Sequence, residues 1–407
     1  MTARLTTRVR QLSLIVGLAT LAGCGGSHVA ASTKTIRASR TAAVGNAPWA
    51  ASEIRGLRGQ GWTTDFSTHA VALTEFQDGG PPRDGIPPID HPRLVALASG
   101  DRFLTPHEPV IAVQVGGQAR AYPEQILVWH EIVNDDLGGI PIAVSYCPLC
   151  NSAIVFDRHV GARTLTFGTT GKLRNSDLVM WDRQTQSWWQ QFTGAALVGA
   201  ETGARLRALD SQVLSWTQFK AAYPHGTVLS RDTGFQRPYG SNPYQGYDAV
   251  PTSRPQFYQG RIDPRLPPLE RVAAVFAGRQ AVVVPFSALA HHPVVGGSIA
   301  GRPVVVLYTP GVVSALDASS IASSRDVGTA GASDPRVGNH TSRFSAAGAG
   351  AGRFHDRTGS TWDVTGHALD GPLRGAQLRP LRHDEQFWFA LAAFLPRARL
   401  LAAGSGS

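Results

Sequence analysis

The chain has 407 residues, of which 43% are hydrophobic and 16% are charged, a composition that excludes wholesale disorder. Its 44 glycines and 27 prolines favour turns and β structure over long bundled helices. The formal net charge of +9 comes almost entirely from arginine, and no basic run is interleaved with aromatic residues. We therefore expect no nucleic-acid partner.

Residues 1–23 are typical of a bacterial export signal. Three arginines precede an apolar run from Leu12 to Leu21, which is too short to cross a membrane as a mature helix. The string Leu21-Ala-Gly-Cys24 resembles a lipobox, in which Cys24 is lipidated and becomes the new N-terminus. We predict an extracytoplasmic lipoprotein that acyl chains on Cys24 anchor to a bacterial membrane, the alternative being ordinary secretion.

Residues 24–48 are rich in serine, threonine and alanine and should form a flexible tether. Short apolar or alternating runs, bounded by Gly, Pro and Asp, then predict strands over residues 110–115, 142–146, 153–156 and 164–167. Apolar periodicity, with proline at the start or the end, predicts short helices over residues 123–130, 216–223 and 387–395.

The rest of the chain contains the pattern of a tandem duplication. The string Glu108-Pro-Val-Ile-Ala-Val resembles Glu270-Arg-Val-Ala-Ala-Val, and the same spacing pairs Tyr146-Cys-Pro with Tyr308-Thr-Pro. We predict a β-rich α+β fold of two diverged repeat lobes that pack together. The lobes should span residues 84–230 and 269–401, with residues 231–268 as the linker. Residues 319–352, rich in serine, glycine and alanine, should be a disordered surface insertion in the second lobe.

Once Cys24 is lipidated, Cys147 and Cys150 are the only other cysteines. They lie in Tyr146-Cys-Pro-Leu-Cys-Asn151, between two predicted strands. We expect a tight turn that brings the two sulfurs within bonding distance or points both at one metal ion. Thr309 and Val312 stand at the matching positions of the second lobe, so the turn itself does not require cysteine.

Three interpretations of this pair remain open. The first is a redox-active dithiol, which needs no cofactor and in which nearby cations lower the pKa of the attacking thiol. The second is a metal site, for which Cys147 and Cys150 need two further ligands, His130 being the first candidate. The third is a structural disulfide, which would close too small a loop to add much stability.

Lys172, Arg174 and Asn175 have no clear counterparts in the second lobe. They belong to a polar stretch that would line a cleft beside the dithiol, where the cations stabilise a thiolate or an anionic ligand. The other members of this stretch are Ser176, Asp177, Asp182, Arg183, Gln190 and Gln191. The alternative is a twisted β region with surface ion pairs. His130 has a counterpart in His292, which favours a structural histidine.

Several long strings resemble the bacterial DUF3179 family, a domain of unknown function. They are residues 121–134, Tyr146-Cys-Pro-Leu-Cys-Asn-Ser-Ala-Ile-Val-Phe-Asp-Arg, residues 172–191 and Arg231-Asp-Thr-Gly. The resemblance extends over residues 84–401 and carries no known reaction. Some relatives are labelled selenoproteins, which implies a redox role for one position of the Cys-Pro-Leu-Cys turn.

We therefore expect a thiol–disulfide protein in which one of Cys147 and Cys150 attacks and the other resolves the mixed disulfide. Its redox partner or small ligand is left open by the sequence. The alternative is a non-enzymatic lipoprotein that binds a metal ion or a small ligand. Residues 237–248, rich in Tyr, Pro, Gly and Asn, would be a recognition loop, a cover for the site or a set of ordered turns.

Overall fold

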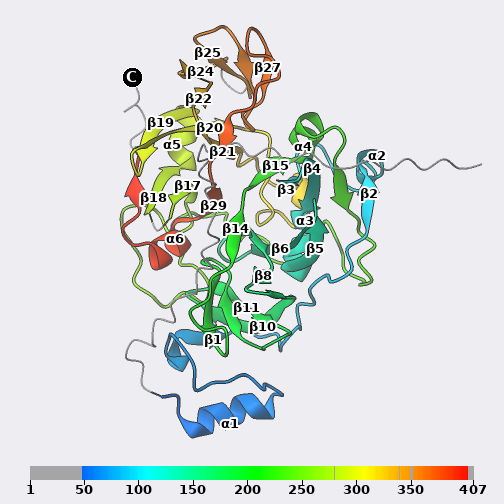
Figure 1. Ribbon diagram of the computed structural model, residues 1–407, viewed down its shortest axis with the longest axis vertical. Helices are drawn as coiled ribbons and strands as arrows, with labels where there is room; N and C mark the ends of the chain where they lie inside the picture. Colours follow the sequence, from blue (N-terminus) through cyan, green and yellow to red (C-terminus); the bar gives the residue numbers. More distant parts are fainter. Residues whose placement is uncertain (1–47, 279, 339, 349–351, 402–407) are drawn as a thin grey trace, which may run out of the picture. The chain divides into compact units, whose positions relative to one another are not determined.

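The computed structural model describes residues 48–278, 280–338, 340–348 and 352–401 (Figure 1). The predicted export signal, Cys24 and all of the predicted tether except its last residue lie outside these ranges. The described part is β-rich, with several sheets and short helices, as predicted. None of its helices is both long enough and apolar enough to cross a membrane.

Three sheets form between residues 76 and 229. The first has the order β15 (Ser211–Ser215), β3 (Pro109–Val115), β4 (Gln118–Pro123), β16 (Thr227–Leu229) and β2 (Leu94–Ala96). The second has the order β14 (Arg207–Leu209), β7 (Ser152–Asp157), β6 (Ile140–Cys147) and β5 (Ile132–Leu137). The third has the order β1 (Phe76–Asp78), β10 (Phe167–Arg174), β11 (Asp177–Asp182), β12 (Trp188–Gln190) and β13 (Ala195–Val198).

Three further sheets form between residues 271 and 400. The fourth sheet has the order β29 (His383–Phe387), β17 (Arg271–Ala277), β18 (Gln280–Pro285) and β30 (Arg399–Leu400). The fifth has the order β19 (Val294–Ile299), β20 (Arg302–Thr309), β21 (Thr329–Asp334) and β28 (Arg379–Pro380). The sixth has the order β24 (Phe344–Ala346), β25 (Phe354–Asp356), β26 (Thr361–Trp362) and β27 (Ala368–Asp370). Two small hairpins complete the strands: β8 (His159–Val160) with β9 (Arg163–Thr164), and β22 (Arg336–Val337) with β23 (His340–Thr341).

The helices are short, and α2 to α6 each begin directly after a strand, whereas α1 precedes the first strand. They are α1 (Ala51–Gly59), α2 (Leu97–Gly100), α3 (Glu124–His130), α4 (Trp216–Ala222), α5 (Phe286–His291) and α6 (Trp388–Phe394), with 3₁₀ turns η1 (Leu73–Glu75) and η2 (Ile321–Ser323). The Ser215 hydroxyl accepts a hydrogen bond from the Gln218 backbone N–H and caps α4. The three predicted helices are confirmed, and so are the first three predicted strands. The fourth, residues 164–167, is divided between β9 and β10, with Leu165 buried between them.

The chain follows the same route in the two halves. The order β3–β4–α3–β5–β6 is repeated as β17–β18–α5–β19–β20. In both halves a late strand pairs in parallel with the second strand of this series, β16 with β4 and β30 with β18. Both halves also contribute to one hydrophobic core, in which Tyr146 and Cys150 of the first half lie with Phe387 and Trp388 of the second.

The predicted disordered insertion at residues 319–352 is wrong. Its residues 329–334 form β21, whose six residues are all buried, and β21 lies between β20 and β28. The small side chains have a packing reason, since a Cβ on Gly331 would lie 2.0 Å from the Val364 carbonyl oxygen. A composition that is typical of disorder here allows close approach of two backbones.

Candidate functional site

The two cysteines occupy a tight turn between β6 and β7. Cys147 ends β6 and pairs with Ser152, the first residue of β7. The Cys150 N–H donates to the Cys147 carbonyl oxygen at 3.2 Å, and Asn151 completes the turn at φ 49°. This left-handed conformation is uncommon for a residue other than glycine, and asparagine tolerates it better than most. The predicted turn therefore forms at the end of a buried strand.

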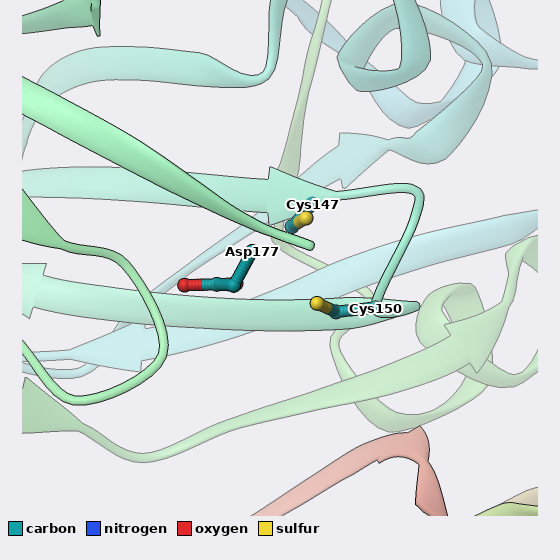
Figure 2. Close-up of side chains that lie close together, drawn as sticks. All are labelled: Cys147, Cys150 and Asp177. Atoms are coloured by element: carbon teal, nitrogen blue, oxygen red, sulfur yellow. The ribbon is translucent and has the colours of Figure 1, made fainter. Parts of the chain in front are cut away.

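The sulfurs meet a carboxylate that comes from another sheet. One oxygen of Asp177 and the sulfurs of Cys147 and Cys150 all lie within 4.8 Å of one another (Figure 2). Both cysteines are free thiols, with exposed fractions of 1% and 0%. The Ser176 carbonyl oxygen lies 3.8 Å from the Cys147 Sγ and 3.5 Å from the Cys150 Sγ.

A turn with strained backbone conformations places Asp177 beside the two sulfurs. Asn175 and Ser176, which link β10 to β11, both have positive φ angles of 54° and 64°. Two successive left-handed residues make the tight hairpin that places Asp177 first on β11. Left-handed residues other than glycine cost conformational energy and are often found at functional sites.

Only one of the two oxygens of the Asp177 carboxylate accepts hydrogen bonds in the described part of the chain. Its Oδ2 accepts hydrogen bonds from the Gln190 Nε2 at 2.5 Å and from the Phe192 backbone N–H at 2.9 Å. Its Oδ1 is buried and has no hydrogen-bond partner in the described part of the chain. Burial raises the pKa of Asp177 to about 7. An unpaired buried oxygen costs about 1–3 kcal/mol, so this atom needs an explanation.

Burial also dominates the electrostatics of the thiols. It raises the pKa of Cys147 and raises that of Cys150 well above its ordinary value. The negative charges of Asp177 and Glu131 raise the pKa of Cys147 further. The resting pair is therefore a neutral dithiol. The expectation that nearby cations lower the thiol pKa is wrong.

The comparison with protein families identifies the family to which most of the chain belongs. The family described as "Protein of unknown function (DUF3179)" matches residues 83–398. The chain belongs to the DUF3179 family. No curated protein matches the chain. No solved structure matches it either.

In this DUF3179 chain the predicted cationic residues point away from the sulfurs. The Lys172 Nζ is paired with Asp78 at 3.0 Å, and the Arg174 Nη2 with Glu75 at 2.6 Å. Both acids lie at or before β1, the strand that pairs with β10. The alternative of surface ion pairs therefore describes Lys172 and Arg174 better than a cleft. Of the predicted residues, Asn175 contributes through its backbone in the turn before Asp177.

Arg174 still reaches the DUF3179 site indirectly. Its Nη1 donates to the Gln190 Oε1 at 3.2 Å, while the Gln190 Nε2 donates to Asp177. Because the amide oxygen is engaged by the guanidinium, the amide nitrogen must face the carboxylate. Arg174 thus orients the residue that holds Asp177.

His130 is not part of the sulfur site. Its Nδ1 donates to the Pro87 carbonyl oxygen at 2.7 Å, and its Nε2 accepts from the Tyr239 hydroxyl at 2.6 Å. Burial lowers the pKa of His130 to about 4, so the ring is neutral. Both ring nitrogens are engaged elsewhere, as expected for a structural histidine, and His130 is not placed to complete a metal site with the cysteines.

The predicted linker covers the Cys turn. The Tyr247 hydroxyl donates to the Leu149 carbonyl oxygen at 2.9 Å, within the turn itself. The Ser176 hydroxyl donates to the Gln256 carbonyl oxygen at 2.6 Å. Tyr247 and Tyr258 are both buried in the core that contains the cysteines. Of the roles considered for residues 237–248, the cover fits this position.

Asp177 belongs to the polar stretch that is predicted to line a cleft beside the dithiol, but the sequence does not single it out from its neighbours. It is separated from Cys150 by more than twenty positions and belongs to a different sheet. The available signal is local: Asn175-Ser176 directly precedes it, a composition suited to a tight hairpin turn. That signal places a turn but does not say what the turn faces.

Proposed function

We propose that this chain is an extracytoplasmic lipoprotein, anchored by Cys24, whose working group is the Cys147–Cys150 dithiol. The pair would alternate between dithiol and disulfide. The observation that carries this proposal is that two free thiols and one Asp177 carboxylate oxygen lie buried and within 4.8 Å of one another. Residues 1–23 would be removed on export, and residues 24–48 would tether the folded part to the membrane.

The chemistry is compatible with burial because neither end state is charged. In the oxidation, a disulfide oxidant R–S–S–R accepts two electrons and two protons and becomes two thiols. Both S–H bonds of the chain break, and one S–S bond forms between Cys147 and Cys150. A buried pocket that raises the cost of a thiolate penalises neither the dithiol nor the disulfide.

The cover determines which oxidants reach the sulfurs. With exposed fractions of 1% and 0%, neither thiol can be attacked from solvent in this conformation. A disulfide partner must therefore displace residues near Tyr247 and Gln256, which contact the turns that hold Cys150 and Asp177. Access to the sulfurs would limit the rate, in addition to the raised pKa values of both thiols.

We also propose that the chain contains two diverged copies of one unit, residues 84–230 and 269–401, packed against each other. The shared strand order and the parallel pairs β16–β4 and β30–β18 support this. The first copy would carry the dithiol and the second would support it. The Phe387 N–H, at the end of β29, donates to the Cys150 carbonyl oxygen at 2.9 Å and contributes to this support.

A redox titration tests the dithiol proposal. The mature protein is equilibrated in thiol–disulfide buffers of different potential and then unfolded in an alkylating reagent. Mass spectrometry gives the number of alkylated cysteines and therefore the fraction of reduced pair. We expect one two-electron transition with a reduction potential above about −300 mV, because structural disulfides typically have potentials below that value. Cys147→Ser and Cys150→Ser should each lose the transition. A pair that stays reduced in every buffer, or a disulfide that resists reduction far below that potential, contradicts the proposal.

A further inference from the structure

The geometry points to a second activity of the same pocket, which goes beyond thiol–disulfide exchange. We propose that the reduced chain binds one thiophilic divalent cation, with Zn²⁺ as the reference ion. The ligands would be the Cys147 Sγ, the Cys150 Sγ and the Asp177 Oδ1. Thiolate sulfur and a single carboxylate oxygen form a donor set that suits Zn²⁺ and excludes Mg²⁺ and Ca²⁺, which prefer oxygen donors.

The spacing of the three donors is close to that of a zinc site. In a tetrahedral site with Zn–S about 2.3 Å and Zn–O about 2.0 Å, neighbouring ligand atoms lie about 3.5 to 3.8 Å apart. The two sulfurs and one oxygen of the Asp177 carboxylate already lie within 4.8 Å of one another. A small contraction of side chains on the β6–β7 turn and at the start of β11 would complete the geometry.

The unpartnered oxygen of Asp177 is an independent indication of a ligand. Asp177 is 0% exposed, and its Oδ1 lacks a partner in the described residues, whereas its Oδ2 accepts two hydrogen bonds. Carboxylates that bind metal ions are held in this way, with one oxygen fixed by neighbouring donors and the other directed at the ion. The Arg174–Gln190 pair fixes the orientation of the amide that makes one of these bonds.

The charge balance favours a cation as the missing partner. In the described residues, no lysine or arginine is hydrogen-bonded or ion-paired to Cys147, Cys150 or Asp177. A divalent ion that displaces the two thiol protons would compensate the charge of two thiolates and a carboxylate, which have no lysine or arginine counter-ion among the described residues.

A fourth donor lies near the same position. The Ser176 carbonyl oxygen is 3.5 Å from the Cys150 Sγ and 3.8 Å from the Cys147 Sγ. It belongs to the residue directly before Asp177, so the left-handed turn presents both oxygens to the sulfurs. The ion would therefore be enclosed by two turns, one from each of two sheets.

Zinc titration of the mature chain tests this inference. The protein is reduced with a phosphine, freed of metal with a chelator, and titrated with Zn²⁺ against a chromophoric competitor. We expect one Zn²⁺ per chain, no binding by Cys147→Ser, and affinity at least tenfold weaker in Asp177→Asn. The matched control is Asp136→Asn on β5, whose side chain is 76% exposed and which should bind Zn²⁺ as the unaltered chain does.

The oxidised chain provides a second measurement that does not depend on a variant folding. Converting the same protein to its disulfide should abolish zinc binding, because the sulfurs are then no longer thiolates. Absence of stoichiometric Zn²⁺ in the reduced chain, or equal affinity in Asp177→Asn, overturns the inference. If the disulfide never forms but zinc binds, the redox proposal fails and the zinc-site proposal stands. If the pair converts reversibly between dithiol and disulfide but zinc does not bind, only the zinc-site proposal fails.

Discussion

Replacing Cys147 by threonine together with Cys150 by valine should leave the chain folded and abolish both thiol oxidation and zinc uptake. These are the residues at the matching positions of the second half, Thr309 and Val312. Thr309 ends β20 and Val312 follows it, and the two side chains are 4% and 1% exposed. Threonine and valine are therefore tolerated as buried residues after the corresponding strand, and we expect a change in unfolding free energy of only about 1–2 kcal/mol.

The measurement combines thermal unfolding by circular dichroism with alkylation and zinc titration of the same sample. The single variant Cys150→Val is the control, since it keeps one thiol in the same pocket and should still be alkylated once unfolded. A double variant that fails to fold would show that the pair is structural. A folded double variant that still binds one Zn²⁺ would remove the cysteines from the metal site.

The second large effect concerns Glu124, the buried first residue of α3. Burial raises the pKa of Glu124 to about 8, with Arg271 opposing the shift and Glu385 adding to it. The folded chain therefore holds a proton on Glu124 at pH values where the unfolded chain has lost it. The contribution of Glu124 to the free energy of unfolding is therefore fully present below about pH 4.5. It falls by about 1.4 kcal/mol per pH unit as the pH rises towards 8.

Glu124→Gln should remove this dependence on pH. The variant should match the unaltered chain near pH 4.5 and exceed its unfolding free energy by about 3 kcal/mol at pH 7, measured by urea unfolding across that range. Glu53→Gln, an exposed residue of α1, is the control and should leave the profile unchanged. Parallel pH profiles for Glu124→Gln and the unaltered chain would contradict the assignment.

Local pattern was enough to predict most elements around the site. Pro123 before an apolar run, and Pro224 after one, mark the ends of helices that the structure contains nearly residue for residue. Strands β3, β6 and β7 were predicted because their apolar runs are bounded by turn residues. In these segments the composition of a few neighbouring residues determines the structure.

The errors arise where distant contacts decide the outcome. Strand β21 was missed because its small residues satisfy a close backbone approach at Gly331 that only the folded chain reveals. Lys172 and Arg174 were placed beside the sulfurs because they are close to them in sequence. Their partners on and before β1 lie more than ninety positions earlier. For the same reason the sequence does not single out Asp177 within its polar stretch, since its position beside the two sulfurs joins two sheets.

The most direct test is the state of Cys147 and Cys150 in protein taken from its native membrane. Cells are quenched in acid, free thiols are alkylated, and the two cysteines are read by mass spectrometry before and after exposure to a disulfide oxidant. We predict a reduced fraction that converts reversibly to the Cys147–Cys150 disulfide. Thiols that never convert, or a disulfide that no cellular reductant opens, would show that the pair does no thiol–disulfide chemistry.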